Sequence, residues 1–328
     1  DSTFPTDAFR SIRVRVDAGS KGGWVVDAEY NDNPTTESDD LAIGDRVVVM
    51  RTEAFVGETR FIVTDRYRIP ALALLTAVFI GCAVLFAGRR GLTSVLGLGF
   101  SVAILLKYTV PSIVNGNDPF VVASISAFII AIVSLTVAHG FSRQTGVALA
   151  STLLTLILSL GLSHVFVRTA HLLGLGSEEA FFLRFGDLST IDLRGLLLAG
   201  IVIGVLGVLD DVTTAQTAAI KEIAHVTGRI GVKPLFKKGL SVGREHIVSL
   251  VNTLALAYAG ASLPLLLLFS MNEGVIPVWL VLNGEMIAEE VVRTLVGSTV
   301  LVLAVPLSTL LAAWYYGGNS KWRPLKNG

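Results

Sequence analysis

Residues 120–138 read FVVASISAFIIAIVSLTVA and contain no charged side chain. Roughly 17–25 apolar residues in a helix cross the hydrocarbon layer of a bilayer, so this stretch predicts a transmembrane helix. Six other stretches resemble it, although one of them, 195–209, is short: 71–87, 92–113, 147–167, 195–209, 247–269 and 294–316. The sequence therefore predicts a mainly α fold, a polytopic membrane helix bundle of about seven transmembrane helices.

Composition divides the chain into unequal parts. Only 16% of the residues are charged, against about a quarter in soluble domains, and many of these precede Arg68-Ile69-Pro70. We expect an extracytoplasmic β-domain at residues 1–69, a transmembrane helical domain at 70–318 and a cytoplasmic tail at 319–328. The polar start has no apolar signal segment, so we expect the natural chain to begin upstream of Asp1. The formal net charge of zero gives no indication of nucleic-acid binding.

The distribution of basic residues predicts the orientation. Short loops that stay in the cytoplasm carry an excess of Lys and Arg. In a seven-span alternation these residues fall on one side: Arg89, Arg90, Arg143, Lys221, Arg229, Lys233, Lys237, Lys238, Arg244, Lys321, Arg323 and Lys326. This places the β-domain outside the cytoplasm and the C-terminus inside it.

The N-terminal region alternates like β-strands. Residues 12–16 have a period of two, residues 44–49 read as a turn into a buried strand, and residues 60–64 form a third candidate. These short strands favour a small barrel of the OB type. No catalytic constellation is evident in them, so we interpret the domain as a scaffold or contact module.

The most unusual polar residues are Asp210 and Asp211, which follow the short apolar stretch 195–209. If the helix continues through 212–220, both carboxylates lie within the bilayer, where ionisable groups usually face the protein interior or a water-filled path. One face of such a helix would carry Asp211, Thr214, Ala218, Glu222 and His225. The carboxylates, the hydroxyl and the imidazole on this face suit a proton, Na⁺ or a divalent cation. The alternative is that the acid pair simply meets water at the cytoplasmic end of a span.

A second polar cluster enters the stretch 247–269. Glu245 and His246 precede it, and Asn252 lies within it as a polar residue that needs a partner. Gly260 and Pro264 predict a kink or break later in the same span.

A third cluster enters the last span. Glu285, Glu289 and Arg293 are spaced by four, so one helical face carries two acids and a base. A structural ion pair between Glu289 and Arg293 explains this face without any transport.

Three motifs together resemble the YibE/F-like family of bacterial multi-pass membrane proteins. They are Leu-Asp210-Asp211-Val-Thr-Thr-Ala-Gln216, Gly243-Arg-Glu-His246 with Asn252-Thr, and Ala288-Glu-Glu-Val-Val-Arg293-Thr-Leu-Val-Gly297. The resemblance extends from about Gly44 to Gly317. It implies a bacterial plasma-membrane protein with a suggested transporter or permease role, and family members typically have an N-terminal span before the β-domain.

The leading functional hypothesis is a transporter or channel for a small ion or solute. The predicted ion or substrate site consists of Asp210, Asp211, Thr214, Gln216, Asn252, Glu289 and Arg293, and the predicted metal ligands are Glu222, His225, Glu245 and His246. The expected ligand is a cation (H⁺, Na⁺ or a divalent metal), and the expected partners are the lipid bilayer and a second copy or another membrane protein.

Two alternatives remain open. A membrane-embedded metal-dependent hydrolase would use the acids and histidines, although the sequence contains no His-Glu-x-x-His. A receptor or assembly scaffold would use the intramembrane acids only to hold helices together. A transporter needs a polar path to the acids, whereas a scaffold needs acids that are salt-bridged and dry.

Overall fold

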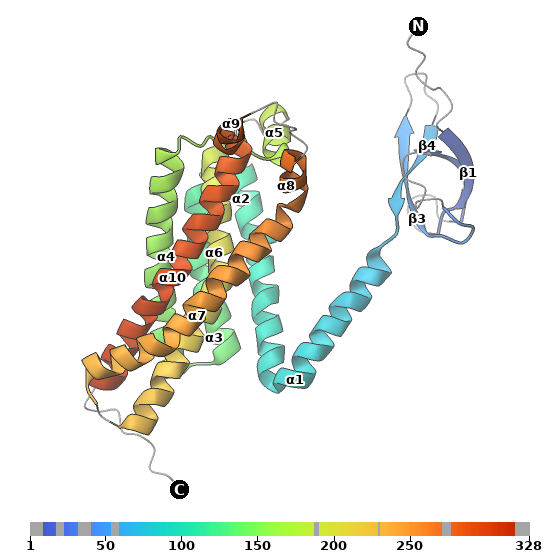
Figure 1. Cartoon of the computed structure of the whole chain (residues 1–328). Coiled ribbons are helices and arrows are strands. Elements are labelled where there is room, and N and C mark those ends of the chain that lie inside the picture. Colours follow the sequence, from blue (N-terminus) through green and yellow to red (C-terminus); the bar gives the residue numbers. More distant parts are fainter. Residues whose placement is uncertain are drawn as a thin grey trace. The chain divides into compact units, whose positions relative to one another are not determined.

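The computed structural model describes residues 9–17, 23–31, 41–53, 59–186, 190–228, 230–270 and 277–318. The chain divides into two compact units, residues 1–82 and 83–328. The first contains four β-strands and the start of a long helix, and the second contains the helical bundle (Figure 1). The expected cytoplasmic tail at 319–328 lies outside the described residues, so that assignment stays a prediction.

The strands of the first unit form one sheet in the order β1-β2-β4-β3. They are β1 (Phe9–Arg15), β2 (Val25–Asn31), β3 (Val47–Glu53) and β4 (Thr59–Arg66). The pairs β1–β2 and β3–β4 are antiparallel, whereas β2 and β4 run parallel. Val26 and Ala28 alternate on β2 and bury their side chains, which fixes the covered face of this strand.

The expectation of an OB-type barrel is wrong. The described strands form an open sheet with β1 and β3 at its two edges. An OB barrel has five strands, and closure of such a barrel is what removes exposed edges. Three of the four strands cover stretches that the sequence pattern predicts, whereas β2 was not predicted.

Helix α1 (Ile69–Ile104) contains the first predicted span and the start of the second. Gly88 interrupts it with φ 57° and ψ −134°, a conformation that glycine accepts because it has no Cβ. Beyond α1 the chain continues through the π-helical turn η1 (Leu105–Thr109) and α2 (Val110–Val114). A proline at 111 lacks the N–H that a regular helix would use, which fits an irregular turn at this point.

The second unit is built around four long helices that pack side by side (Figure 1). They are α3 (Pro119–His139), α4 (Arg143–Thr169), α6 (Leu193–Thr227) and α10 (Glu285–Gly318). Completely buried alanines, including Ala127, Ala131 and Ala304, line the main core and allow the backbones to approach closely.

Within the described residues, five helical segments are long and apolar enough to cross a membrane, rather than seven. They are Ile69–Val114, Pro119–His139, Arg143–Thr169, Leu193–Thr227 and Glu285–Gly318. The first combines two predicted spans, 71–87 and 92–113. The predicted span 247–269 is not among the five, because its residues are divided between α7 (Val232–Ala261), which begins with basic residues, and α8 (Leu263–Ser270).

The predicted break in the stretch 247–269 is confirmed. Helix α7 ends at Ala261, next to Gly260, and α8 begins at Leu263, just before Pro264. Two short helices, α5 (Glu178–Phe185) and α9 (Val278–Asn283), lie near α8 at the same end of the bundle (Figure 1). Helix α7 packs against α10 and α6.

Candidate functional site

Helix α6 continues through both acids. The Asp192 side chain accepts a hydrogen bond from the Arg194 N–H at its start, and Gly228 ends it with φ 68°. Because neither glycine nor proline occurs between Asp210 and Thr227, the helix has no local reason to stop at the acid pair. Residues 193–209 precede Asp210 and residues 211–227 follow it, so this aspartate is the middle residue of the 35-residue helix. The continuation of the helix through 212–220, on which the predicted position of the acids depends, is thus observed.

The carboxylate of Asp210 is partly buried and incompletely paired. Its Oδ1 is inaccessible to solvent and has no hydrogen-bond partner among the described residues. The same is true of Ser159 Oγ on α4 and Thr217 Oγ1 on α6. Nearby, the Thr213 and Thr152 hydroxyls lie 2.7 Å apart and join α6 to α4. Buried polar atoms are nearly always satisfied, so the unpaired carboxylate oxygen of Asp210 within a packed helix identifies this residue as a candidate site residue.

Gln216 has a structural contact in this region. It is 3% exposed, and its Nε2 donates to the Gly239 carbonyl oxygen at 3.0 Å and to Thr309 Oγ1 at 2.7 Å. It therefore joins α6, α7 and α10 within the core. Thr214 donates its hydroxyl to the Asp210 carbonyl oxygen one turn earlier in α6.

The opposite face of α6 is exposed and carries small or polar side chains. Its exposed residues from Leu193 to His225 are Gly200, Gly204, Gly207, Asp211, Ala215, Glu222 and His225. Asp211 thus lies on a different face from the buried hydroxyls. Within the fully described stretch from Leu193 to His225 no large apolar side chain is exposed, although Val226 is 84% exposed at the end of α6, whereas α4 exposes Leu154, Ile157 and Val165. Around the two acids, the exposed face of α6 therefore lacks the bulky apolar side chains that α4 presents outward.

The predicted metal ligands do not come together. Glu222 and His225 are exposed on α6, and Glu245 and His246 are exposed on α7. Throughout the described ranges, no group of three or more His, Cys, Asp or Glu side chains is arranged to hold a metal ion. Asn252, also exposed on α7, stays a predicted site residue.

The acids at the start of α10 bind the backbone of the segment that follows α4. Glu285 Oε1 accepts the N–H groups of Leu173 at 2.6 Å and Leu175 at 3.3 Å, and Glu289 Oε1 accepts that of Gly176 at 2.9 Å. Glu289 is 5% exposed. Two carboxylates thus satisfy three N–H groups that no regular helix or strand uses, and they fix residues 172–176 on α10.

The same segment is held from a second direction. Arg194 donates from Nε to the Leu172 carbonyl oxygen at 2.8 Å. His171 has a positive φ of 54°, and Gly174 has a φ of 84°. Residues 170–176 are therefore a tightly specified connection.

The expected ion pair between Glu289 and Arg293 is corrected by these contacts. Arg293 Nη1 pairs with Glu290 Oε2 at 3.3 Å, three residues away, whereas Glu289 accepts a backbone N–H. The spacing of four residues suggested that Glu289 pairs with Arg293, but residues three apart, such as Glu290 and Arg293, are also helical neighbours. Glu289 and Arg293 therefore both lie near the start of α10, but each makes a different interaction.

We predict that Glu289→Ala loosens the connection between α4 and α5. A partly buried N–H of Gly176 would lose its charged acceptor, which costs about 1 kcal/mol of the free energy of unfolding. Hydrogen exchange of residues 172–176 should accelerate. Glu290→Ala is the matched control, because it removes the partner of Arg293 and leaves the Gly176 contact intact. Equal exchange in the two variants would contradict the assigned contact.

Sequence reasoning missed the buried hydroxyls of α4. Ser151, Thr152, Thr155, Ser159 and Ser163 are completely buried, and several follow each other at spacings of three or four. That spacing, inside the apolar stretch 147–167, was the signal that could have identified them.

Long apolar helices joined in one bundle define a multi-pass membrane protein, associated with the lipid bilayer. Residues 75–318 match the model of the YibE/F-like protein family, and the chain belongs to that family. No curated protein and no solved structure matches the chain.

Proposed function

We propose that this protein is a transporter or channel for a small cation in the bacterial plasma membrane, with Asp210 at its binding site. The observation that carries the proposal is the partly buried Asp210 carboxylate, whose Oδ1 has no partner among the described residues. Carboxylate and hydroxyl oxygens suit H⁺, Na⁺ and divalent cations alike.

The length of α6 supports a position inside the hydrocarbon layer for this carboxylate. Its 35 residues extend roughly 50 Å at about 1.5 Å per residue. The hydrocarbon layer is about 30 Å thick, so any placement in which a straight α6 crosses it completely includes the helix midpoint. Asp210 is that midpoint. An ionisable group inside the hydrocarbon layer is costly unless it faces the protein interior or water.

The exposed face of α6 supports a polar path beside it. Gly204, Gly207, Asp211 and Ala215 share this face, and none offers the apolar bulk expected of a surface against lipid. A water-filled path would hydrate Asp211 and bring a cation to the neighbouring Asp210. Small side chains would leave room for that path.

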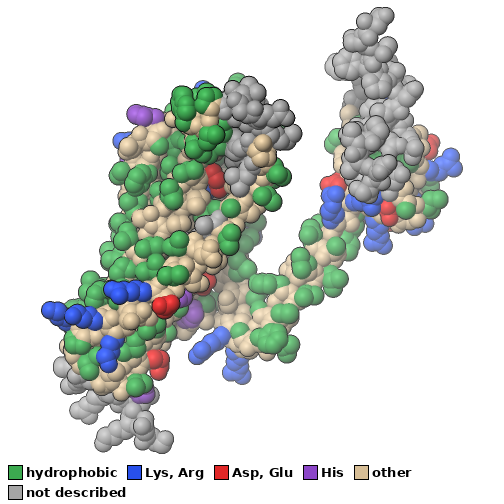
Figure 2. All heavy atoms as spheres, in the orientation of Figure 1, with side chains coloured by type: hydrophobic (Ala, Val, Ile, Leu, Met, Phe, Trp, Pro, Cys, Tyr) green, Lys and Arg blue, Asp and Glu red, His purple; other side chains and the backbone are tan. Residues whose placement is uncertain are grey.

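The proposed topology has seven spans. Gly88 would separate the segment Ile69–Val114 into two spans. Helices α7 and α8 together would form one further span, and the other four candidate segments would each form one. In Figure 2, Lys and Arg side chains of the bundle gather at the end where α7 begins, and Lys233, Lys237 and Arg244 are exposed there. The positive-inside rule favours the cytoplasm for this end and the extracytoplasmic side for the β-domain.

The two alternatives have less support. A hydrolase needs a metal or an activated nucleophile beside the acids, and the four predicted metal ligands are dispersed on exposed surfaces. A scaffold would use its acids in ion pairs, and within the described part of the chain neither Asp210 nor Asp211 has a salt bridge. For Asp210 and Asp211 these observations favour transport, whereas Glu285 and Glu289 have structural contacts with backbone N–H groups.

Ion flux into proteoliposomes tests the proposal. We expect the wild type to move one of H⁺, Na⁺, Mg²⁺, Ca²⁺ or Mn²⁺, and the double variant Asp210→Asn, Asp211→Asn to lose that flux. Unchanged thermal unfolding would establish that the variant is folded. If none of these ions moves, or if the folded double variant matches the wild type, the acids are structural and the transport proposal fails.

A further inference from the structure

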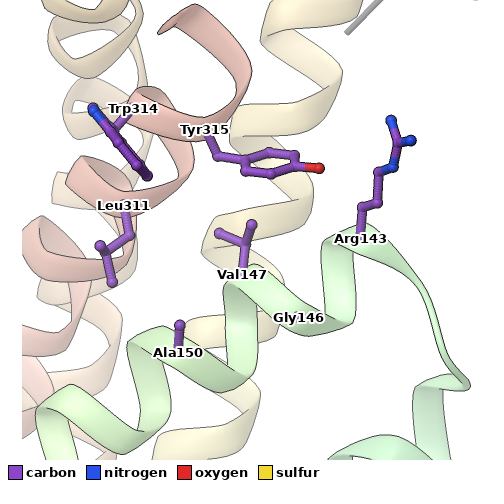
Figure 3. Close-up of a pocket in the computed structure, with 7 residues that line it drawn as sticks. All are labelled: Arg143, Gly146, Val147, Ala150, Leu311, Trp314 and Tyr315. Carbon is purple, nitrogen blue, oxygen red and sulfur yellow. The ribbon is translucent and has the colours of Figure 1, made fainter. Parts of the chain in front are cut away.

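An apolar groove lies between the beginning of α4 and the end of α10. Its volume is about 360 Å³, within the roughly 300–1,000 Å³ range of small-molecule sites. The lining residues are Arg143, Gly146, Val147, Ala150, Leu311, Trp314 and Tyr315. Figure 3 shows Leu311 and Trp314 at one end, Tyr315 above Val147, and Arg143 at the other end.

One end of this groove is cationic. Arg143 is exposed at the first turn of α4, and its guanidinium forms no salt bridge with a carboxylate of the described residues. In Figure 3 the Tyr315 hydroxyl points toward the Arg143 side of the groove. A second cation, Lys221, lies near the same turn, where its Nζ donates to Gln144 Oε1 at 3.2 Å. The positive end of the α4 dipole adds to the attraction of an anion.

The groove also lies where a membrane protein meets the lipid interface. Trp314 and Tyr315 come near the end of the last candidate span, and such aromatic residues are enriched at the level of the lipid headgroups. Trp314 is 68% exposed, so most of its surface is open to a neighbouring molecule. An amphiphile with an apolar chain and an anionic head matches this arrangement of groups.

We propose that the groove binds one anionic phospholipid. An acyl chain lies along Val147, Ala150 and Leu311 against the Trp314 ring, and the phosphate lies beside Arg143. Basic pockets between transmembrane helices bind anionic headgroups for the same electrostatic reason. The site is independent of the proposed transport, because it contains neither Asp210 nor any other predicted ion ligand.

Quenching of tryptophan fluorescence by brominated lipids tests this proposal. Full-length protein would be placed in two kinds of nanodisc. One contains acyl-brominated phosphatidylglycerol in unlabelled phosphatidylcholine, and the other contains acyl-brominated phosphatidylcholine in unlabelled phosphatidylglycerol. Trp314→Phe isolates the contribution of Trp314 to the signal. We expect phosphatidylglycerol to quench Trp314 at about fivefold lower mole fraction than phosphatidylcholine, the factor expected from one basic residue near an anionic surface.

The variant Arg143→Gln should abolish this preference while leaving thermal unfolding unchanged. Arg168→Gln is the matched control, since Arg168 is an exposed arginine at the other end of the same helix. Equal quenching by the two lipids, or a preference that survives Arg143→Gln, would overturn the proposal. The proposal would also be overturned if neither brominated lipid quenched Trp314 and a second copy of the protein could be cross-linked through the groove.

Discussion

Gly174→Ala should lower the free energy of unfolding by about 2–5 kcal/mol. Gly174 has a φ of 84°, a conformation that costs residues with a Cβ about 1–2 kcal/mol. A Cβ at this position would also lie 2.1 Å from the Leu193 carbonyl oxygen, which is backbone and cannot rotate away. Overpacking of this kind typically costs a further 1–3 kcal/mol. Thermal or denaturant unfolding of the purified protein in detergent would measure the loss.

Gly161→Ala is the control for this prediction. Gly161 lies inside α4, and a Cβ there meets no atom within 4 Å. Alanine is a better helix former than glycine, so this variant should be as stable as the wild type or slightly more stable. If Gly174→Ala were equally stable, the close approach of the 170–176 connection to the start of α6 would be wrong.

The length of helix α6 is consistent with its sequence, but the face that it turns toward the core could not be predicted. From the sequence alone it was open whether the helix continues past Asp210, and residues 212–220 contain neither glycine nor proline to stop it. The predicted ligand face of Asp211, Glu222 and His225 is exposed, whereas Thr213 and Gln216 face the core. Which face a helix buries depends on its neighbours, and α6 offers small or apolar residues on several faces.

The contacts of Glu285 and Glu289 were beyond prediction for a different reason. Their partners are backbone N–H groups of Leu173, Leu175 and Gly176, more than a hundred positions earlier in the chain. Every residue except proline carries such a donor, so the sequence gives no sign of which one a carboxylate will meet. Spacing pointed instead to Arg293, which pairs with Glu290.

In the N-terminal unit, alternation predicted strands but not their arrangement. The stretch that forms β2 alternates Val26, Ala28 and Tyr30 with acids and was overlooked. Because β2 lies between β1 and β4, its omission removed the strand that joins the two hairpins. The parallel contact of β2 with β4 connects the two hairpins, and the sheet stays open because the described edge strands β1 and β3 do not pair with each other.

The second large effect is expected when the two acids are changed separately. Asp210→Asn should reduce cation flux at least about tenfold, since loss of a charged ligand worth 1.4 kcal/mol or more has that consequence. Asp211→Asn should keep flux within about fivefold of the wild type, because Asp211 is exposed and an exposed charge contributes about 1 kcal/mol or less. Glu222→Gln, on the same exposed face, should leave flux unchanged.

Initial rates in proteoliposomes at matched protein content would separate the three variants. A larger loss in Asp211→Asn than in Asp210→Asn would place the binding site on the exposed face of α6 and refute its assignment to the partly buried Asp210 carboxylate.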